Sequence, residues 1–284
     1  ESGMIEPPDE HYRGTLTDVC AGEGAEIWGS SRFGLLHHDG STWEVFDRRQ
    51  GLPTEQFERV ARDGEGRFWF QTYEKGILKL TGDTWVHYST ASGLPDDRIE
   101  DLIVDKNGEP WILTLSGEVA RFRGGRWETL ALPVEQHAPI PDSDSVRTRE
   151  SFIRFISARG EGKDHYGGLG DAVLGLDGLG NCIVACDRGI FRFTGADWQV
   201  IDIPDGLGEL GATAVLGTSR GTIWVGTEGN GIFIRSRGGW RRLGTDQGLF
   251  DDHIESLCED ASGSIWIGTR SGGLSRFMPG RTTD

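Results

Sequence analysis

Residues 248–277 read GLFDDHIESLCEDASGSIWIGTRSGGLSRF, and they contain the fullest copy of a pattern that recurs through the chain. A short apolar segment, IESLC, precedes a turn rich in Asp and Gly. A second apolar segment around Trp266 and a third segment, GLSRF, then follow. Gly supplies the positive φ angles that tight turns between strands need. The stretch therefore predicts short antiparallel strands joined by tight turns.

Tryptophan marks the repeat in two columns. The first column is Trp28, Trp69, Trp111, Ile183, Trp224 and Trp266, at spacings of 41, 42, 72, 41 and 42 residues. The second column is Trp43, Trp85, Trp127, Trp198 and Trp240. Together the columns contain all 10 tryptophans of the chain. Four short strands in about 40–50 residues, repeated along the chain, are typical of a β-propeller.

We therefore expect an all-β fold, a single β-propeller domain over residues 1–284 with six four-stranded blades. The last repeat ends without an outer strand, and residues 2–7 are predicted to supply that strand and close the ring. The 72-residue step places an insertion at residues 133–168, between the third and fourth blades. Its apolar pattern predicts a short helix within it, and a seventh, shortened blade in the same stretch remains an alternative.

Composition excludes several classes of partner. Gly accounts for 44 of the 284 residues, about twice the usual share of roughly 7%, as expected for many turns. The formal net charge of −16 opposes binding to nucleic-acid phosphates. No apolar run approaches the ~20 residues of a membrane span, so we expect no membrane insertion. The opening ESGMIEPPDE has no signal-peptide pattern, which leaves a removed leader or a native start at Met4 open.

The four cysteines are predicted to be free thiols that pack as small buried apolar residues. Cys182 and Cys186 lie in one predicted strand, about 13 Å apart along it, which is too far for a disulfide. Cys20 and Cys258 occupy matching inner-strand positions in the first and last repeats.

The repeat also resembles a known family. Its pattern is G-L-[PF]-D-D-x-I-x-x-L, then D-x-x-G-x-x-W-[IV]-G-T, then G-[LI]-x-[RK]-F, and it is similar to the two-component regulator propeller repeat. Residues 248–277 match it almost completely, and residues 93–123 match it except for WILT in place of the WIGT-like run. The resemblance implies a propeller like the extracytoplasmic sensor portions of bacterial hybrid histidine kinases, whose ligands are often carbohydrates. It implies a periplasmic or extracellular location, whereas a native start at Met4 would imply a cytoplasmic one.

The candidate site is the mouth of the central channel, where the loops between second and third strands and the connectors between blades are expected to meet. Mixed charge around a concave rim suits a polar ligand. Two arginines of the 133–168 insertion are expected to lie over the same rim. The predicted ligand-binding residues are Arg32, Tyr73, Lys75, Arg98, Arg188, Glu228, Asn230, His253, Arg270, Arg147 and Arg154.

The sequence contains no recognised nucleophile motif, and its seven histidines form no metal-ligand pattern. We therefore expect a non-catalytic, sensor-like propeller without a cofactor, which binds a small polar molecule, a carbohydrate, a peptide or a protein partner. The alternative is a metal-assisted lyase or hydrolase that resembles the streptogramin lyases. In that case His137, His165 and His253 could meet Asp97, Asp251 and Asp252 at the loop face to hold a metal ion.

Overall fold

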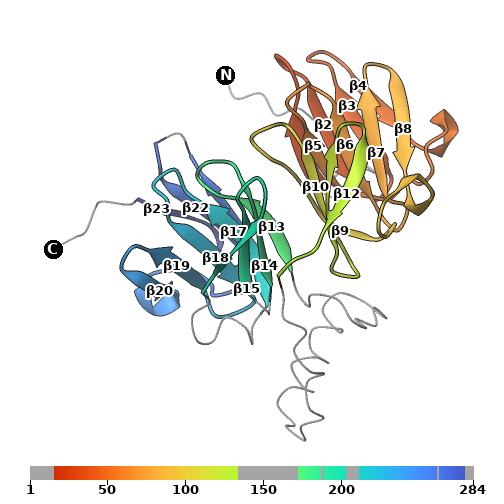
Figure 1. Ribbon diagram of the computed structural model, residues 1–284. Coiled ribbons are helices and arrows are strands. Elements are labelled where there is room, and N and C mark those ends of the chain that lie inside the picture. The colour runs from red at the N-terminus through yellow and green to blue at the C-terminus, as the bar shows by residue number, and fades with distance from the viewer. Residues whose placement is uncertain (1–15, 134–171, 187–188, 203–210, 261, 279–284) are drawn as a thin grey trace, which may run out of the picture.

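The computed structural model describes residues 16–133, 172–186, 189–202, 211–260 and 262–278. Within these residues, 23 strands form six antiparallel sheets in chain order, the blades of a β-propeller (Figure 1). Five sheets have four strands, and the last has three among the residues described. Three short 3-10 turns, η2 (Arg48–Gln50), η3 (Thr90–Ser92) and η4 (Thr245–Gln247), lie in connectors between blades. The predicted all-β propeller with six blades is confirmed.

The strands of each blade run in sequence order from the inner to the outer edge. Blade 1 is β1 (Leu16–Ala21), β2 (Ile27–Ser31), β3 (Gly34–His38) and β4 (Trp43–Phe46). Blade 2 is β5 (Phe57–Arg62), β6 (Phe68–Thr72), β7 (Ile77–Thr81) and β8 (Thr84–Tyr88). Blade 3 is β9 (Ile99–Val104), β10 (Pro110–Thr114), β11 (Val119–Arg123) and β12 (Arg126–Leu130).

The second half of the chain repeats this order. Blade 4 is β13 (Val173–Leu176), β14 (Cys182–Cys186), β15 (Gly189–Phe193) and β16 (Trp198–Ile201). Blade 5 is β17 (Ala212–Gly217), β18 (Ile223–Thr227), β19 (Ile232–Ser236) and β20 (Gly239–Leu243). Blade 6 is β21 (Ile254–Glu259), β22 (Ile265–Thr269) and β23 (Gly273–Phe277). The predicted ring-closing strand at residues 2–7 and the insertion at 133–168 lie outside the described residues.

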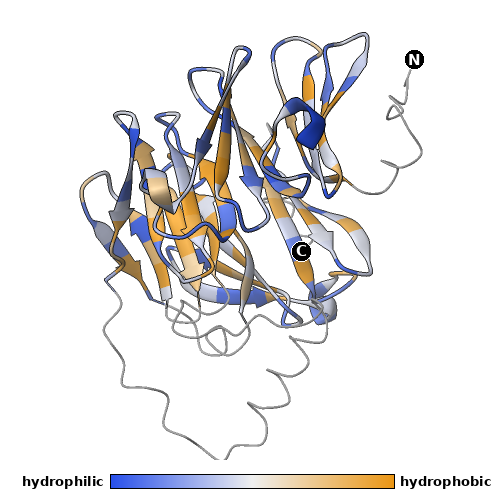
Figure 2. Ribbon diagram, turned by 90° about the vertical axis from the view of Figure 1, so that its right-hand side faces the viewer, coloured by the Kyte–Doolittle hydropathy of each residue, from blue (hydrophilic) through white to orange (hydrophobic). Residues whose placement is uncertain are grey.

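The hydrophobic core lies between the blades. Five clusters of buried apolar side chains fill the interfaces of the five pairs of consecutive blades. Figure 2 shows this distribution, with apolar residues along the strands and hydrophilic residues at the turns. Blades 3 and 4 pack directly on one another, because Trp111 and Leu113 share a cluster with Leu174 and Val184.

The first tryptophan column builds these interfaces. Trp28 meets Trp85 of the next blade with ring centroids 6.1 Å apart and planes at 82°. Trp69 and Trp127 repeat the contact at 5.8 Å and 84°, and Trp111 meets Trp198 at 6.0 Å. These edge-to-face pairs are a favoured aromatic geometry. The two tryptophan columns therefore meet across each of these interfaces, and the regular spacing in the sequence follows from this contact.

In blades 2, 3 and 6 an aspartate fixes the orientation of the column-one indole. Trp69 donates its indole N–H to Asp63 at 2.7 Å, and Trp111 and Trp266 donate to Asp105 and Asp260. Each Asp lies six residues before its Trp, so this bond explains the D-x-x-G-x-x-W spacing. The same carboxylate caps the intervening turn, as Asp63 does by accepting from the backbone N–H groups of Glu65 and Arg67.

The ring has two exposed faces where blades 6 and 1 would meet. Inner strands of consecutive blades lie side by side from β1 through β5, β9, β13 and β17 to β21. At the two ends of this series, Val19 is 59% exposed and Leu274 is 61% exposed. No neighbouring blade among the described residues covers these two side chains.

All four cysteines are free, as predicted. Cys182 and Cys186 are buried, and burial raises the pKa of the Cys182 thiol well above its ordinary value. The prediction that all four are buried is correct only for Cys182 and Cys186. Cys20 is partly buried and Cys258 is exposed, because their strands belong to the two end blades, 1 and 6.

The Asp–Trp bond can be tested by removing its acceptor. Asp63→Ala should lower the free energy of unfolding by about 2–4 kcal/mol, because it leaves the Trp69 indole and two backbone N–H groups without their acceptor. Asp197→Ala, at an exposed turn, is the control and should change stability by less than about 0.5 kcal/mol. Equal effects of the two substitutions in urea unfolding would contradict this role for Asp63.

Candidate ligand-binding site

The predicted site residues gather at one end of the propeller, here called the loop end. It consists of the loops between the second and third strands of each blade and the connectors between blades. Backbone hydrogen bonds join the two sets: Gly76 N–H donates to the Asp97 carbonyl at 2.7 Å, and Arg270 N–H donates to the His253 carbonyl at 3.0 Å. The connectors therefore reach the same end as these loops, as the sequence predicted.

The paired acids of the connectors hold these loops in place. Asp97 accepts from the backbone N–H of Thr90 at 2.6 Å, and Asp252 accepts from that of Thr245 at 2.8 Å. Each bond ties a connector to the start of its 3-10 turn, which ends at a glycine with positive φ, such as Gly248 at 104°. The aspartates of the D-D motif thus accept backbone hydrogen bonds within the connectors.

Asp251 has the same structural role in blade 6. Its carboxylate accepts from the backbone N–H of His253 at 3.0 Å and from that of Ser271 at 2.8 Å. The His253 ring nitrogen Nδ1 lies 3.0 Å from the same carboxylate. The backbone hydrogen bond from His253 is the largest cause that holds the pKa of Asp251 well below its usual range. His253 is therefore oriented by an ionised neighbour.

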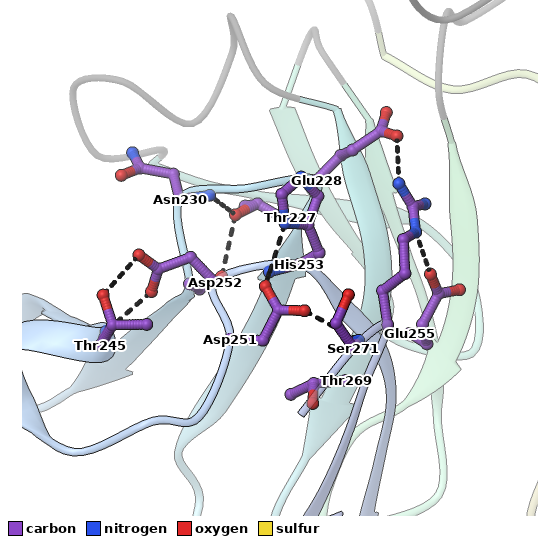
Figure 3. Close-up of polar contacts among 12 residues, drawn as sticks. Thr227, Glu228, Asn230, Thr245, Asp251, Asp252, His253, Glu255, Thr269 and Ser271 are labelled. Carbon is purple, nitrogen blue, oxygen red and sulfur yellow. Dashed lines mark hydrogen bonds and ion pairs between the residues drawn. The ribbon is translucent and has the colours of Figure 1, made fainter. Parts of the chain in front are cut away.

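Blades 5 and 6 place an arginine between two glutamates (Figure 3). Arg270 Nη1 lies 3.1 Å from Glu228 Oε1, and Arg270 Nε lies 2.8 Å from Glu255 Oε1. The hydrogen bond to Glu255 is the largest cause that raises the pKa of the guanidinium. The Arg270 side chain is still 47% exposed, so it retains surface that a ligand can contact. Asn230 lies in the same loop as Glu228, where its backbone N–H donates to Thr227 Oγ1 at 3.1 Å.

Blades 2 and 3 bring together a second group. Arg98 makes a two-point contact with Asp96, at 2.7 Å from Nη2 and 3.2 Å from Nε. This contact is the largest cause that raises the pKa of Arg98. Tyr73 and Lys75 belong to the adjacent β6–β7 loop and are both exposed. The carbonyl of Lys75 accepts a 2.6 Å bond from the His87 ring.

The remaining predicted residues are placed as follows. Arg32 is exposed in the β2–β3 turn of blade 1, beside the exposed ring of Phe33. Arg188, Arg147 and Arg154 lie outside the described residues. The structure thus brings Glu228, Asn230, His253 and Arg270 together in one neighbourhood and Tyr73, Lys75 and Arg98 in another.

A further set of side chains at the loop end was not among the predicted site residues. In five inner strands the pairing register shifts around the second residue of the strand, as at a β-bulge. Bulges re-aim a side chain, and the Glu255 carboxylate at one of them reaches Arg270. The signal was present in FERVAR, IEDLIV and IESLC, where the second residue is always Glu. The five residues at the register shifts are Thr17, Glu58, Glu100, Thr213 and Glu255.

The chemistry of the loop end is that of polar recognition. Carboxylates and guanidinium groups accept and donate hydrogen bonds, and Phe250 adds an aromatic side chain that is 70% exposed. Among the described residues, no group of three or more His, Cys, Asp or Glu side chains is placed to hold a metal ion. The described helical turns include none long and apolar enough to cross a membrane.

Comparison with known families identifies one segment. Residues 248–271 match the two component regulator propeller. The resemblance seen in the sequence is confirmed there, and the propeller repeat includes Asp251, Asp252, His253 and Glu255 of the site. A comparison with curated proteins finds no match.

Solved structures share the fold at low identity. The extracellular domain of the putative hybrid two component system BT4673 from B. thetaiotaomicron aligns with a TM-score of 0.65 and 15% identity. The alignment covers 92% of this chain and 32% of that one, so the present chain spans about a third of the BT4673 domain. Virginiamycin B lyase from Staphylococcus aureus aligns with a TM-score of 0.64 and 12% identity, over 93% of this chain and 84% of that one. YCF48 from Cyanidioschyzon merolae aligns with a TM-score of 0.58 and 16% identity, over 92% of this chain and 81% of that one.

The structural role of Asp251 predicts a pH-dependent effect. Its pKa is lower in the folded protein than in the unfolded chain, so its stabilising contribution is complete above the unfolded value of about 3.9 and declines as the pH falls below that value. Asp251→Asn should therefore lower the melting temperature at pH 7, and the difference from the unsubstituted protein should shrink below about pH 4.

Thermal unfolding followed by circular dichroism from pH 3 to 7 measures this difference. Glu55→Gln, an exposed carboxylate in the connector between blades 1 and 2, is the control and should leave the melting temperature at pH 7 unchanged. A difference for Asp251→Asn that stays constant across this pH range would show that the carboxylate charge does not stabilise the connector.

Proposed function

We propose that the protein is a non-catalytic, sensor-like propeller that binds a polar ligand at its loop end. The observation that carries the proposal is Arg270, which two glutamates orient from both sides while nearly half of its side chain remains exposed. Glu228 comes from blade 5, whereas Glu255 and Arg270 come from blade 6. A ligand that contacts this group would therefore contact two blades at once.

A carbohydrate fits this end best, with a peptide or another small polar molecule as the alternatives. Sugar hydroxyls can donate to carboxylates and accept from guanidinium groups, and both are present in the oriented Glu228–Arg270–Glu255 group. The exposed aromatic residues Phe33, Tyr73 and Phe250 of the loop end offer rings on which a sugar face can pack. Arg32, Lys75, Arg98, Asn230 and His253 would add polar contacts.

The comparisons support a sensor role outside the cytoplasm. Residues 248–271 match the two component regulator propeller, and the BT4673 structures are extracellular domains of putative one or two component systems. We propose a periplasmic or extracellular location on this basis. We also propose that the 133–168 insertion, through Arg147 and Arg154, and Arg188 contribute to the same site, and that residues 2–7 complete blade 6.

Binding is favoured over catalysis. The likeness to virginiamycin B lyase at 12% identity is a likeness of fold. At the loop end, the acids that the lyase hypothesis would use as metal ligands, Asp97, Asp251 and Asp252, already accept backbone hydrogen bonds. The described part of blades 5 and 6 instead offers the preoriented guanidinium of Arg270.

A binding screen followed by site-directed variants tests this proposal. Soluble oligosaccharides and short peptides would first be screened by thermal shift, since a ligand that binds the folded state alone stabilises it. Arg270→Ala should then weaken the binding of the best hit by about tenfold or more in isothermal titration calorimetry. Arg235→Ala is the matched control, because Arg235 lies toward the opposite end of the blade and pairs with Asp202.

Two results would contradict the proposal. Unchanged affinity in Arg270→Ala would remove the loop end of blades 5 and 6 from the site. Mass spectrometry with and without Mg²⁺ would detect any conversion of the bound compound to a product. Such conversion would show that the protein is an enzyme and would support the lyase-like alternative.

A further inference from the structure

A cation lies over the column-one tryptophan in blades 2, 3 and 6, where the last is Arg276 over Trp266 at 5.1 Å. In β7, Lys79 Nζ lies 5.5 Å from the ring centroids of Trp69, Tyr88 and Phe122. In β11, the Arg121 guanidinium carbon lies 5.4 Å from the Trp111 ring. Cations within about 6 Å of aromatic centroids are attracted by the ring faces. Each cation belongs to the third-strand residue that pairs directly with the tryptophan.

Blade 1 carries a histidine at this position. His37 pairs with Trp28 across β2 and β3, and its ring stacks on the indole with centroids 4.3 Å apart. Its Nε2 lies 3.1 Å from Glu26. An imidazole reaches less far from the backbone than a lysine or arginine head group, so the outer part of this interface is not filled by the third strand.

A cavity of about 550 Å³ lies at this interface between blades 1 and 2. This volume falls within the roughly 300–1,000 Å³ of small-molecule sites. Its aromatic walls are Trp28, Phe46, Phe68 and Trp85. It is formed at the turns between first and second strands, so it lies at the end of the blades opposite to the loop end.

In blade 3, two carboxylates hold the guanidinium of Arg121 at the corresponding interface. Arg121 of β11 lies between Glu109, at 3.6 Å, and Glu128, at 3.2 Å. In blade 1 the acids at the matching positions are Glu26, two residues before Trp28, and Glu44, which pairs with His37 across β3 and β4. Arg121 and Glu128 pair in the same way. Blade 1 thus has a glutamate at each of the two positions whose glutamates hold Arg121 in blade 3.

The other charges around the cavity leave it net negative. Five carboxylates line it, from Glu23, Glu26, Glu44, Glu65 and Asp83, against Arg62 and His37. Arg62 pairs with Glu23 at 2.8 Å, and its guanidinium lies 5.9 Å from the centroid of the Phe68 ring. Glu65 pairs with Arg67 outside the cavity at 2.6 Å. Among the described residues, Glu44 and Asp83 are engaged in no such ion pair.

We propose that this cavity binds a small organic cation, whose guanidinium or primary ammonium group stacks against the aromatic walls and pairs with Glu44. The bound group lies beyond the His37 ring, which itself stacks on Trp28, and it pairs with the acid that matches Glu128 of blade 3. This site is separate from the loop end and does not depend on the function proposed for it.

Blade 5 provides a contrast that supports this assignment. Its third-strand residue opposite Trp224 is Ile234, and the cavity at that interface is only about 100 Å³. Its wall includes the cationic side chains Arg220 and Arg241, and Arg241 lies 5.7 Å from the Phe277 ring. That interface is too small and too basic for a second organic cation.

Titration calorimetry with agmatine, which carries one guanidinium and one ammonium group, tests the proposal on the full chain. The unsubstituted protein should bind agmatine and should not bind the neutral analogue n-butylurea. His37→Arg should abolish binding, because it supplies the guanidinium from the chain itself as Arg121 does. Glu44→Gln should weaken binding by about tenfold, and its exposed position keeps the fold intact.

Two controls make the result specific. Glu128→Gln removes the matching acid of blade 3, and Arg270→Ala alters the loop end; both should leave agmatine affinity unchanged. The proposal is overturned if agmatine does not bind at up to about 10 mM. It is overturned equally if affinity is the same in His37→Arg and Glu44→Gln as in the unsubstituted protein, or if n-butylurea binds as well as agmatine.

Discussion

In blades 2, 3 and 6, a hydrogen bond joins the second-strand indole to the aspartate six residues before it, and it links the turn within a blade to the packing of the tryptophan. In blades 1 and 5 the indoles donate instead to Glu26 and Thr222. The bond to aspartate fixes the ring of Trp69 or Trp111 at an angle that meets the outer-strand tryptophan of the next blade edge to face. The same aspartate caps the turn between the first two strands. In blades 2 and 3 one aspartate therefore caps the turn within a blade and orients the indole that packs against the next blade.

This arrangement leaves the two ends of the blades free for different tasks. At the loop end, connector acids such as Asp251 and Asp252 are committed to backbone N–H groups, so recognition rests on side chains that they position, above all Arg270. At the opposite end, the side chain that the third strand places over the column-one tryptophan differs from blade to blade. Lys79 and Arg121 fill theirs, whereas His37 leaves a cavity beside Glu44.

The fold could be predicted from the sequence because tryptophan is rare and its position is fixed by packing, so its spacing reports the blades directly. The roles of the polar residues could not be predicted, because the spacing of residues in the sequence does not show which groups a carboxylate contacts. Asp97, Asp251 and Asp252 were considered as metal ligands at the loop face, yet they accept backbone hydrogen bonds. Glu255 was missed because only the register shift in β21 places it against Arg270. The exposure of Cys258 depends on the seam between blades 6 and 1, which no local pattern encodes.

The central claim is that one repeated interface, built on the column-one tryptophan, holds a cation from the chain in blades 2 and 3 and accepts one from solution in blade 1. A crystal structure of the protein grown with agmatine tests this most directly. We expect guanidinium density in the cavity beside Glu44 and the His37 ring, with Lys79 and Arg121 in place over their own tryptophans. Well-ordered agmatine only elsewhere, or an interface between blades 1 and 2 closed by side chains with no space beside Glu44, would contradict it.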